Sequence, residues 1–537
     1  MKSNTTHKVN VIRCKNKNGE IRVKVNTKEE TENPVLCVNA RNDESYSFKV
    51  LPERQQKRTL IFIIPVAKLS PLNLYYDVFL EYKNLKGECK SEKVSNKSRI
   101  QRLFVNILHS RQQRVTYSGS NYIVTEYFSV GGILSFQVRE TDQYDSLKYY
   151  LKEILACIIV PFVYWYYKDS KLTYEKFSNY ARDNSFYYFS YVQENIKNNK
   201  LYFVIKKESP DLDNLLPYKK HVVYFMSIKH LILALVAKYL IASEAKGHLY
   251  TWRHNQSIIK FMLNRKPFVF LQHGVLGLKQ VDKTFFANNK MNHADLFITS
   301  SEIEKKIVMK FLGYRSENVS VTGLARWDNQ EVEKTEKKIF VMPTWRVQIE
   351  LLSDEEFLAS DFYQAYSKLL HSTKIKKVLH DNDYTLHFMM HPKFVRFEKY
   401  FRSNDQRIKM MHQSDISIDK ELKSSELVIT DYSSIMWDSL YYGHPVLLFQ
   451  FDQAEYLRLQ GSYFDFNKDF RNLIVKRSDT LLNKLDKFIS GEEQVELQEY
   501  RDKYFAYIDK NNSQRINEAV NTWEKKYQFK SLFSKLF

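Results

Sequence analysis

Polar side chains suited to phosphate chemistry gather in short segments that each follow an apolar run. One such run is Leu427–Ile429, and the turn Thr430–Ser434 after it is rich in residues that cap helix N-termini. The next apolar residues recur at helical spacing: Ile435, Met436, Leu440 and Tyr441. Free backbone N–H groups and the helix dipole attract an anion at such a strand-to-helix turn, and serine hydroxyls add donors. The pattern predicts a phosphate-binding turn late in the chain.

Two histidines also follow apolar runs. His273 comes directly after Pro267–Gln272 and is followed by two glycines and Lys279, whereas His391 follows Tyr384–Met390. The residue after His391 is proline, which keeps this histidine out of helical geometry. An imidazole exposed at a strand end can take up a proton near neutral pH, although a lone histidine is often structural. Both histidines are therefore candidate site residues, and we expect them in different halves of the fold.

Two arginines complete this set. Arg326 lies in the segment Thr322–Asp328, and Arg346 ends the segment Met342–Arg346. A guanidinium just past a strand end can hold phosphate oxygens through two donors, although each arginine alone fits a surface ion pair equally well. Two histidines, two arginines and a serine turn that face one cleft would form a site for a pyrophosphate.

The elements that must position these residues alternate between strands and helices from about residue 150. Buried parallel strands separated by helices are typical of doubly wound domains. We expect helices at Lys229–Leu240 and Glu302–Phe311. The predicted strands are Tyr202–Ile205, His221–Phe225, Leu240–Ser243, Pro267–Gln272, Asp295–Ser300, Val319–Thr322, Lys338–Pro343, Tyr384–Met390, Leu427–Ile429 and Pro445–Gln450. This series predicts two consecutive Rossmann-type domains, at 150–325 and 326–510, with a cleft between them.

Residues 1–145 are predicted to be β-rich. Short apolar runs are separated there by turns rich in Asn, Lys, Gly and Asp, which favours a small sandwich or barrel. The runs are Val9–Arg13, Ile21–Val25, Thr59–Pro65 and Tyr122–Phe128. We find no catalytic cluster among them, so a binding or positioning module is the expectation for this region.

Composition limits the possible partners. The formal net charge of +20 favours nucleic acid, anionic lipid or an anionic substrate. Nucleic acid is disfavoured because neither zinc-finger spacing nor an RRM-like aromatic signature is found. The four cysteines form no CxxC pair, which argues against a disulfide framework and a zinc site. The first residues lack the apolar core of a signal peptide, so we expect none.

Two segments are candidates for contact with a membrane. The apolar run Ile154–Tyr167 contains Pro161 and is shorter than the ~20 residues of a spanning helix. It is either a buried helix or strand, or an interfacial segment with Trp and Tyr at the headgroup level. The basic region 511–537 ends in Lys525–Phe537, where apolar residues recur at helical spacing. That end either packs back on the protein or lies in the plane of an anionic leaflet, and the basic balance favours the leaflet.

The ordered series of motifs resembles the CDP-glycerol glycerophosphotransferases, which include teichoic acid primases and polymerases of Gram-positive bacteria. The resemblance covers about residues 150 to 510 and rests on the motifs QHG, TGLARWD, MPTWR, MHPK and TDYSSxxWD. It implies an α/β, GT-B-like fold and a peripheral enzyme at the cytoplasmic face of the bacterial membrane. It also implies a CDP-glycerol or related CDP-alditol donor and a lipid-linked polyol-phosphate acceptor.

The resemblance implies a role for each motif. His273 becomes the general base that takes the proton from the acceptor hydroxyl, and His391 contacts the pyrophosphate and stabilises the charge that leaves on CMP. Gly274 lets the acceptor approach the backbone, and Asp438 holds a donor hydroxyl or the ribose. The other implied substrate-binding residues are Lys279, Arg326, Thr344, Trp345, Arg346, Pro392, Thr430, Ser433 and Ser434. Arg326 and Arg346 would neutralise phosphate oxygens, as in other phosphoryl transfers.

Several alternatives stay open. Val275 and Leu276 stand where many relatives have a Thr-Pro or similar pair, so the acceptor contacts differ there. The donor is CDP-glycerol or CDP-ribitol, and a capsule polymerase is a related reading. Two further alternatives concern the type of protein. They are a sugar-nucleotide glycosyltransferase of the same fold and a non-catalytic scaffold that binds anionic lipid or polymer. No metal site is apparent, although Asp431 and Asp438 could hold Mg²⁺.

Overall fold

The chain folds into two compact units, which we describe separately. The computed structural model describes residues 9–527, apart from residues 18, 42–43, 71–74, 97, 108–111, 118, 130, 252–257, 282, 290, 330–333, 351 and 413–416. The β-rich unit comprises Met1–Lys168, Tyr224–Val236 and Tyr250–Lys266. The parallel-sheet unit comprises Asp169–Val223, Ala237–Leu249 and Pro267–Phe537. The apolar end of the chain beyond Tyr527, predicted above as a possible anchor, lies outside the described residues.

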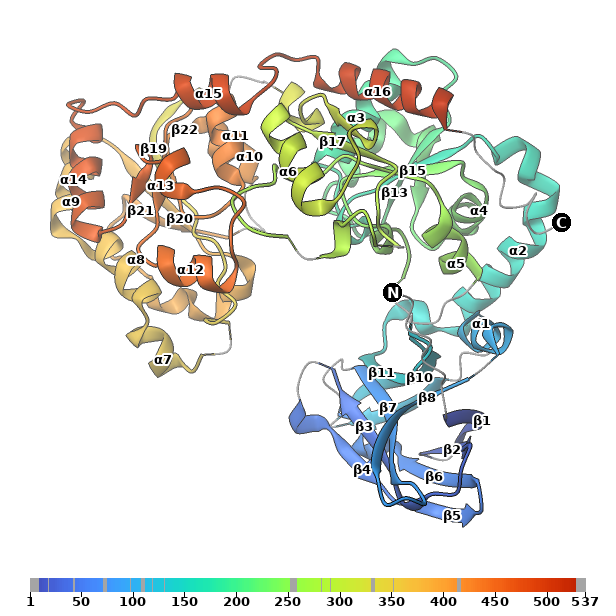
Figure 1. The fold of residues 1–537 in the computed structure, drawn as a ribbon. Helices are drawn as coiled ribbons and strands as arrows, with labels where there is room; N and C mark the ends of the chain where they lie inside the picture. Colours follow the sequence, from blue (N-terminus) through green and yellow to red (C-terminus); the bar gives the residue numbers. More distant parts are fainter. Residues whose placement is uncertain are drawn as a thin grey trace. The chain divides into compact units, whose positions relative to one another are not determined.

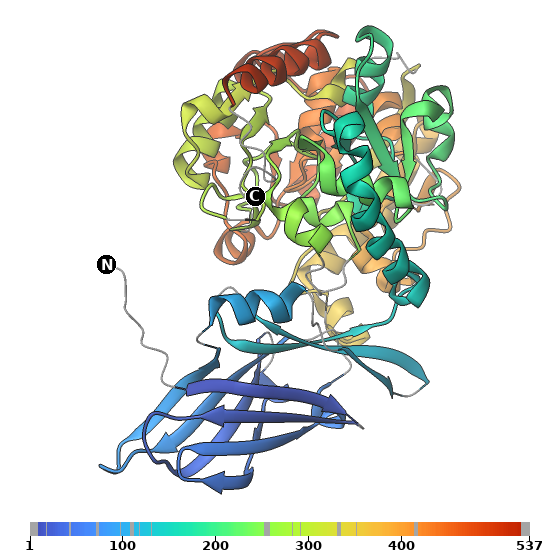
Figure 2. The same ribbon diagram turned by 90° about the vertical axis from the view of Figure 1, so that its right-hand side faces the viewer.

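The β-rich unit is built on an 11-stranded, mostly antiparallel sheet. The four runs predicted from sequence fall on β1, β2, β6 and β10, which all contribute buried apolar residues to one core. Burial alternates along β2 and β6, as expected for a strand with one buried face, and is continuous over the second half of β10. Helix α1 (Arg99–Ile107) lies against β10 (Figures 1 and 2). The strands are β1 (Val9–Lys17), β2 (Glu20–Asn26), β3 (Glu32–Ala40), β4 (Phe48–Val50), β5 (Pro52–Gln56), β6 (Thr59–Pro65), β7 (Tyr75–Lys83), β8 (Cys89–Ser95), β9 (Gln112–Tyr117), β10 (Ser120–Phe128) and β11 (Leu134–Glu140).

Helix α2 (Leu147–Tyr167) completes this unit together with α4 (Ile228–Val236) and α5 (Ile258–Arg265). It contains the apolar run whose environment the sequence left open. One face packs on α4 and buries Glu153, Ala156 and Val160. The opposite face exposes a stripe of large apolar side chains: Leu151, Ile154, Leu155, Ile158, Phe162, Trp165 and Tyr166. Within the described part of the chain, no helix combines the length and apolar character needed to cross a membrane.

The parallel-sheet unit contains two sheets flanked by helices, which confirms the predicted α/β class (Figure 1). The first sheet has the strand order β14-β13-β12-β15-β16-β17-β18, and the second has the order β21-β20-β19-β22-β23-β24. The strand order reverses between β12 and β15 in the first sheet and between β19 and β22 in the second. In open parallel sheets, ligands bind beside such a point, at the carboxyl ends of the strands. The strands of the first sheet are β12 (Lys171–Thr173), β13 (Leu201–Ile205), β14 (Val222–Tyr224), β15 (Tyr239–Ala242), β16 (Phe268–Phe270), β17 (Leu296–Thr299) and β18 (Val319–Val321). Those of the second are β19 (Glu336–Val341), β20 (Thr385–Met389), β21 (Ile408–Met411), β22 (Ser425–Thr430), β23 (Val446–Phe449) and β24 (Ile474–Val475).

The helices that matter for the site lie next to these strand ends. They are α3 (Asn184–Asn195), α6 (Glu302–Leu312) and α11 (Ile435–Tyr442), with the short 3-10 turns η4 (Lys176–Ser178), η9 (Ala325–Asp328) and η10 (Pro392–Tyr400). The helix predicted at Lys229–Leu240 ends instead at Val236, because Tyr239 already begins β15. The remaining helices of the unit are α7 (Asp354–Ala359), α8 (Asp361–His371), α9 (Thr373–Asp381), α10 (Ile418–Ser424), α12 (Gln453–Leu459), α13 (Phe466–Asp469), α14 (Ser478–Ile489), α15 (Gln498–Tyr504) and α16 (Asn512–Lys526).

Helix α16 comes from the C-terminal region yet packs on the first parallel sheet. Its buried residues Ile516, Val520 and Trp523 belong to the same core as Phe189 of α3 and Tyr239 of β15. The rings of Trp523 and Tyr239 meet edge to face, with centroids 5.1 Å apart. Residues 512–526 therefore pack back on the protein.

Candidate active site

The histidine loop and the serine turn meet in the parallel-sheet unit. The histidine loop, residues 272–281, follows β16, and the serine turn, residues 430–434, connects β22 to α11. A Cβ atom added to Gly274 would lie 2.9 Å from the Ser434 hydroxyl oxygen, closer than real Cβ contacts. Only glycine thus permits this approach. The two motifs are 160 residues apart in sequence, and the fold brings them together.

Further along, the histidine loop is bonded to the segment Gly461–Tyr463 of the second half. The Gly277 carbonyl accepts from the Tyr463 N–H at 2.9 Å, and the Gln280 N–H donates to the Gly461 carbonyl at 3.1 Å. A Cβ at Gly277 would overlap the Phe464 ring, at 2.0 Å. These bonds hold the loop that carries His273 against the half of the unit that carries the serine turn.

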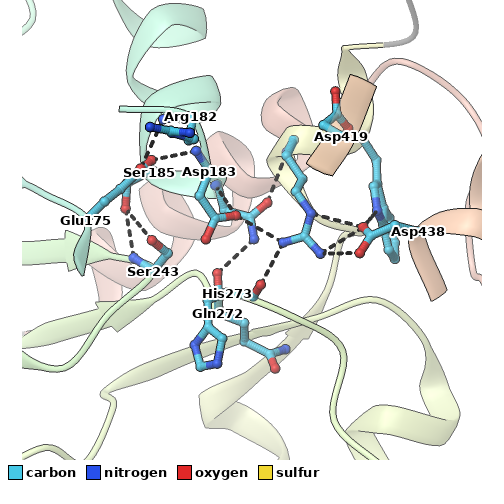
Figure 3. Close-up of polar contacts among 12 residues, drawn as sticks. Glu175, Arg182, Asp183, Ser185, Ser243, Gln272, His273, Asp419 and Asp438 are labelled. Atoms are coloured by element: carbon cyan, nitrogen blue, oxygen red, sulfur yellow. Dashed lines mark hydrogen bonds and ion pairs between the residues drawn. The ribbon is translucent and has the colours of Figure 1, made fainter. Parts of the chain in front are cut away.

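Arg326 holds three parts of the site together. Its guanidinium pairs with Asp183 at 3.0 Å and with Asp438 at 2.8 Å, and it donates to the His273 carbonyl at 2.9 Å. Asp183, His273 and Asp438, which are labelled in Figure 3, supply the acceptors of these bonds. Burial acts to lower the pKa of Arg326, but the two carboxylates outweigh it and raise the pKa above its usual value, so the guanidinium stays charged. Arg326 therefore fixes the histidine loop relative to α3 and α11, and it has only 13% of its side chain exposed for any contact with phosphate.

The surroundings of His273 favour its neutral form. The imidazole is accessible to solvent from a cavity of about 450 Å³, but the protein atoms around it remove much of its hydration. This loss of hydration lowers the pKa of His273, and the positive charges of Lys279, Arg326 and Lys176 lower it further, against the opposing effect of Glu244. A neutral imidazole at pH 7 is able to accept a proton.

His391 faces the same positive charges. Burial lowers its pKa to about 4, and Lys393, Lys279 and Lys176 act in the same direction. Lys279 and Lys176 thus act on the pKa of both histidines. The Nδ1 atom of His391 accepts from the Lys393 N–H at 3.2 Å. The ring proton must therefore be on Nε2, so that His391 presents a neutral N–H donor.

The serine turn offers two partly exposed hydroxyl groups, of which that of Ser433 accepts from the Ile435 N–H at 3.4 Å and keeps its own proton to donate. Ser433 and Ser434 are partly exposed at the N-terminus of α11, and the Ser434 side chain makes no capping bond. Thr430 differs from expectation, because it is fully buried and its hydroxyl donates to the Met342 carbonyl at 2.7 Å. It thus joins β22 to the end of β19 and has no access to a diphosphate.

Arg346 also differs from the expectation of a phosphate contact. Its side chain is fully buried and pairs with Asp431 at 2.9 Å and with Asp452 at 2.7 Å. It also donates to the Thr344 carbonyl at 2.7 Å, and Tyr432 stacks beneath it at 4.8 Å. Its hydrogen-bond donors are occupied by protein acceptors, so Arg346 stabilises the serine turn through its ion pair with Asp431.

Asp438 and Asp431 are likewise committed to protein partners. Asp438 is 7% exposed and accepts from Arg326 and from the Trp327 indole N–H at 2.7 Å. Asp431 accepts from the N–H groups of Thr344 and Tyr432, at 2.9 and 2.6 Å, as well as from Arg346. Neither carboxylate is free for a ribose or for Mg²⁺, and the described residues include no cluster of three His, Cys, Asp or Glu suited to a metal.

Of the remaining predicted residues, two border the cavity at His273. Lys279 and Trp345 line the cavity together with His273 and Ser434. The Lys393 ammonium lies 3.7 Å from the centre of the Trp345 ring. Two polar groups here are buried without a described hydrogen-bond partner, the Thr344 hydroxyl and the Trp345 indole N–H. Pro392 occupies the first position of η10, next to the capping residue His391.

Three carboxylates of the site were absent from the prediction. Glu175 accepts from the N–H groups of Asp183 and Phe186, at 2.8 and 3.0 Å, and thereby fixes the start of α3. Burial raises the pKa of Glu175 to about 8. Glu304 accepts from the Leu276 N–H at 2.6 Å and thereby fixes the histidine loop to the start of α6. Local signals existed, since Asp183 is an N-cap type before an apolar helix and Ser301 with Glu304 has capping-box spacing.

Comparison with known proteins gives a consistent family assignment. The sequence profile of the CDP-Glycerol:Poly(glycerophosphate) glycerophosphotransferase family matches residues 161–522. The minor teichoic acid biosynthesis protein GgaB of Bacillus subtilis (strain 168) is 29% identical over 361 residues, which cover 63% of this chain and 38% of GgaB. The ribitol-phosphate polymerase TarK of Staphylococcus aureus (strain NCTC 8325 / PS 47) is 26% identical over 40% of this chain and 43% of TarK.

The matches span less than half the length of these two relatives. Among solved structures, the wall teichoic acid polymerase TagF is similar with a TM-score of 0.49 and 15% identity, over 71% of this chain and 99% of the TagF chain.

Proposed function

Because the chain belongs to the CDP-glycerol:poly(glycerophosphate) glycerophosphotransferase family, we propose that it transfers an alditol phosphate from a CDP-alditol to the terminal hydroxyl of a polyol-phosphate chain. CMP is the second product. The observation that carries this proposal is the contact between the histidine loop and the serine turn. It brings a neutral, solvent-accessible imidazole and the Ser434 hydroxyl, at a helix N-terminus, to one cavity.

His273 is the general base of this reaction. It takes the proton from the acceptor hydroxyl, whose oxygen forms a bond to the β-phosphorus of the donor. The bond from that phosphorus to the bridging oxygen breaks, and the electron pair leaves on CMP. A phosphate leaving group needs no proton near pH 7, since its second pKa is about 6. Catalysis then rests on positioning and on electrostatic stabilisation of the pyrophosphate.

His391 and the serine turn supply that stabilisation. The Nε2–H group of His391 donates to a pyrophosphate oxygen, and a pKa of about 4 keeps the ring neutral throughout the physiological range. Ser433 and Ser434 donate from the N-terminus of α11, where the helix dipole favours an anion. Lys176 and Lys279 add positive charge beside both histidines.

The donor is CDP-glycerol in the first instance, with CDP-ribitol as the second candidate. The family profile names glycerophosphate, whereas TarK is a ribitol-phosphate polymerase, so both alditols have a representative among the relatives. A capsule polymerase would use the same chemistry. A sugar-nucleotide glycosyltransferase gains no support from the paired serines and two histidines, and a non-catalytic scaffold would have no use for a base at His273.

The test is CMP release by the purified chain with a short glycerol-phosphate or ribitol-phosphate acceptor. We expect acceptor-dependent CMP release from one of the two CDP-alditols and none from UDP-sugars. Release from CDP-ribitol alone would change the donor and leave the mechanism unchanged. Absence of release from both donors, in a protein that is folded and binds CDP-glycerol, would contradict the transferase.

We also propose that the chain binds the membrane through α2, where its lipid-linked acceptor would be found. The apolar stripe includes Phe162 and Trp165, which are 84% and 74% exposed. Such a stripe on a soluble surface marks an interaction site. Aromatic residues beside lysines are typical of the headgroup region, and the Lys168 ammonium lies 4.6 Å from the Trp165 ring.

Substitution within this stripe should release the protein from lipid. Phe162→Glu with Trp165→Glu should weaken binding to vesicles containing anionic lipid by at least ~10-fold, since each side chain loses about 1.5–3 kcal/mol of apolar burial. Co-sedimentation measures the bound fraction. Leu51→Glu with Leu85→Glu is the matched control, because these residues are 73% and 68% exposed in the same unit. Equal loss in both double variants would refute a specific role for α2.

A further inference from the structure

A second set of polar residues lies at the amino ends of the strands of the first parallel sheet. Two adjoining cavities, of about 410 and 580 Å³, share the turn Ile196–Asn199. The first is bordered by Lys171, Leu201 and Tyr239, which begin β12, β13 and β15. The second is bordered by the end of η5 (Leu212–His221). We refer to the two together as the lysine groove, and its lysines are Lys171, Lys197, Lys200, Lys219, Lys220 and Lys238.

The lysine groove carries a strong positive charge. Among the described residues that line the two cavities, six are lysines and two carry carboxylates, Asp169 and Glu524, which leaves a formal excess of four positive charges in the lining. Lys238 and Lys171 both pair with Glu524, at 2.6 and 3.2 Å, and are thereby held in place. Such a concentration of one charge in a concave surface attracts and retains polyanions.

Three of these lysines extend into solvent. Lys197, Lys219 and Lys220 are exposed and form no ion pair with a residue that the structure describes. An ammonium group without an ion-pair partner gains more electrostatic free energy on binding a phosphate than an ammonium group that already has a carboxylate partner. The free positive charge of the groove is therefore concentrated along the turn after α3 and the end of η5.

Amide groups accompany the lysines. Asn198 and Asn521, which are both exposed, line the first cavity together with Asn517 of α16. An amide both donates and accepts, which matches a hydroxyl group of a polyol. The aromatic side chains of the groove are engaged within the protein: Tyr188 and Tyr239 are buried, the Tyr218 ring packs edge to face on Phe189, and the His221 ring stacks on Tyr202. This arrangement disfavours stacking with nucleobases. The chemistry of the groove suits a ligand with phosphates and hydroxyls and without aromatic rings.

The lysine groove is separate from the active site. His273 and the residues that hold it follow the carboxyl ends of the strands, whereas the groove lies at their amino ends. Strand β13 has five residues, and its rise separates the two ends by roughly 16 Å. The cavity at His273 and the groove share no lining residue.

We propose that the lysine groove is an accessory site for phosphodiester-linked polyol chains and holds a part of the acceptor that has already been polymerised. This proposal rests on the proposed function for the identity of the chain. Each repeat of such a polymer carries one negative charge and at least one hydroxyl or ether oxygen, which the lysines and amides can bind. Contact at two places raises the effective concentration of the chain end at His273. A long acceptor should consequently bind more tightly than a short one.

The test compares two triple variants of the full chain. Lys197→Glu, Lys219→Glu and Lys220→Glu reverse the exposed charges of the groove. Lys306→Glu, Lys377→Glu and Lys420→Glu make the same change in net charge at sites outside both cavities. Lipid-free poly(glycerol phosphate) and poly(ribitol phosphate) oligomers are the probes, and fluorescence anisotropy at several salt concentrations measures their Kd.

We expect the groove variant to bind long oligomers about 10-fold more weakly than the control variant, with a smaller salt dependence. Its KM for a long acceptor should rise by a similar factor, while CMP release with a single-repeat acceptor stays unchanged. Equal affinities in the two variants would overturn the proposal. So would a loss of binding to anionic vesicles without a loss of oligomer binding, since the groove would then contact lipid. Because oligomer binding requires no turnover, failure of the transferase proposal would be seen separately, as oligomer binding without CMP release.

Discussion

His273→Ala is expected to reduce turnover by about 100-fold or more, because a positioned general base contributes a factor of that order. The variant should keep its affinity for the CDP-alditol, since the pyrophosphate is held by His391 and the serine turn. Steady-state CMP release should thus show a large loss in kcat with little change in the KM for the donor. Loss of an interaction made in the transition state gives this pattern.

The pH profile gives an independent readout for His273. Loss of hydration and nearby positive charge lower its pKa, so the imidazole becomes a competent base below the usual value of 6.5. For the wild type, kcat/KM should rise with pH and level off by about neutrality, with its midpoint below 6.5. His273→Ala should remove this acidic limb. His380→Ala, which changes an exposed histidine of α9, is the matched control and should leave the profile unaltered.

A His273→Ala variant with wild-type kcat would refute the general-base role. Reduced kcat combined with an unchanged acidic limb would also refute it, because a positioning role would lower the rate without removing the titration. Thermal unfolding of the variant separates both outcomes from misfolding.

The sequence predicted the elements that carry the site because their signals are local. The apolar run Leu427–Ile429 and the capping residues after it give β22 and α11 within a few positions. The strands β12 and β24 were not predicted. They contain three and two residues, respectively, which are too few to show the alternation of apolar and polar residues that marks a strand. They are strands because neighbouring strands pair with them.

The two arginines show what local sequence cannot distinguish. Each follows a strand end, yet Arg326 joins three elements beside the histidine loop whereas Arg346 is fully buried. The difference lies in the distant acids that meet each guanidinium, Asp183 and Asp438 in one case and Asp431 and Asp452 in the other. Which carboxylates come together is a property of the tertiary fold, so it could not be read from the motifs.

The network around Arg346 should therefore affect stability more than binding. Arg346→Ala should lower the free energy of unfolding by about 3–5 kcal/mol, because it leaves two buried carboxylates without a countercharge. Asp431 also accepts from two backbone N–H groups that shape the serine turn, so turnover should fall with stability. Arg346→Lys should restore only part of the loss, since one ammonium cannot reach Asp431, Asp452 and the Thr344 carbonyl together.

Chemical denaturation measures this loss, and Arg315→Ala is the matched control. The Arg315 side chain is 83% exposed and pairs with Glu317 at 3.8 Å, so its removal should cost at most about 1 kcal/mol. If Arg346→Ala kept the stability of the wild type and raised only the KM for the donor, its guanidinium would contact the substrate. A large loss of stability would instead establish that the motif supplies a buried support for the serine turn. In that case the positive charge that reaches the phosphates must come from residues at the surface of the site, such as Lys176 and Lys279, which lower the pKa of both histidines.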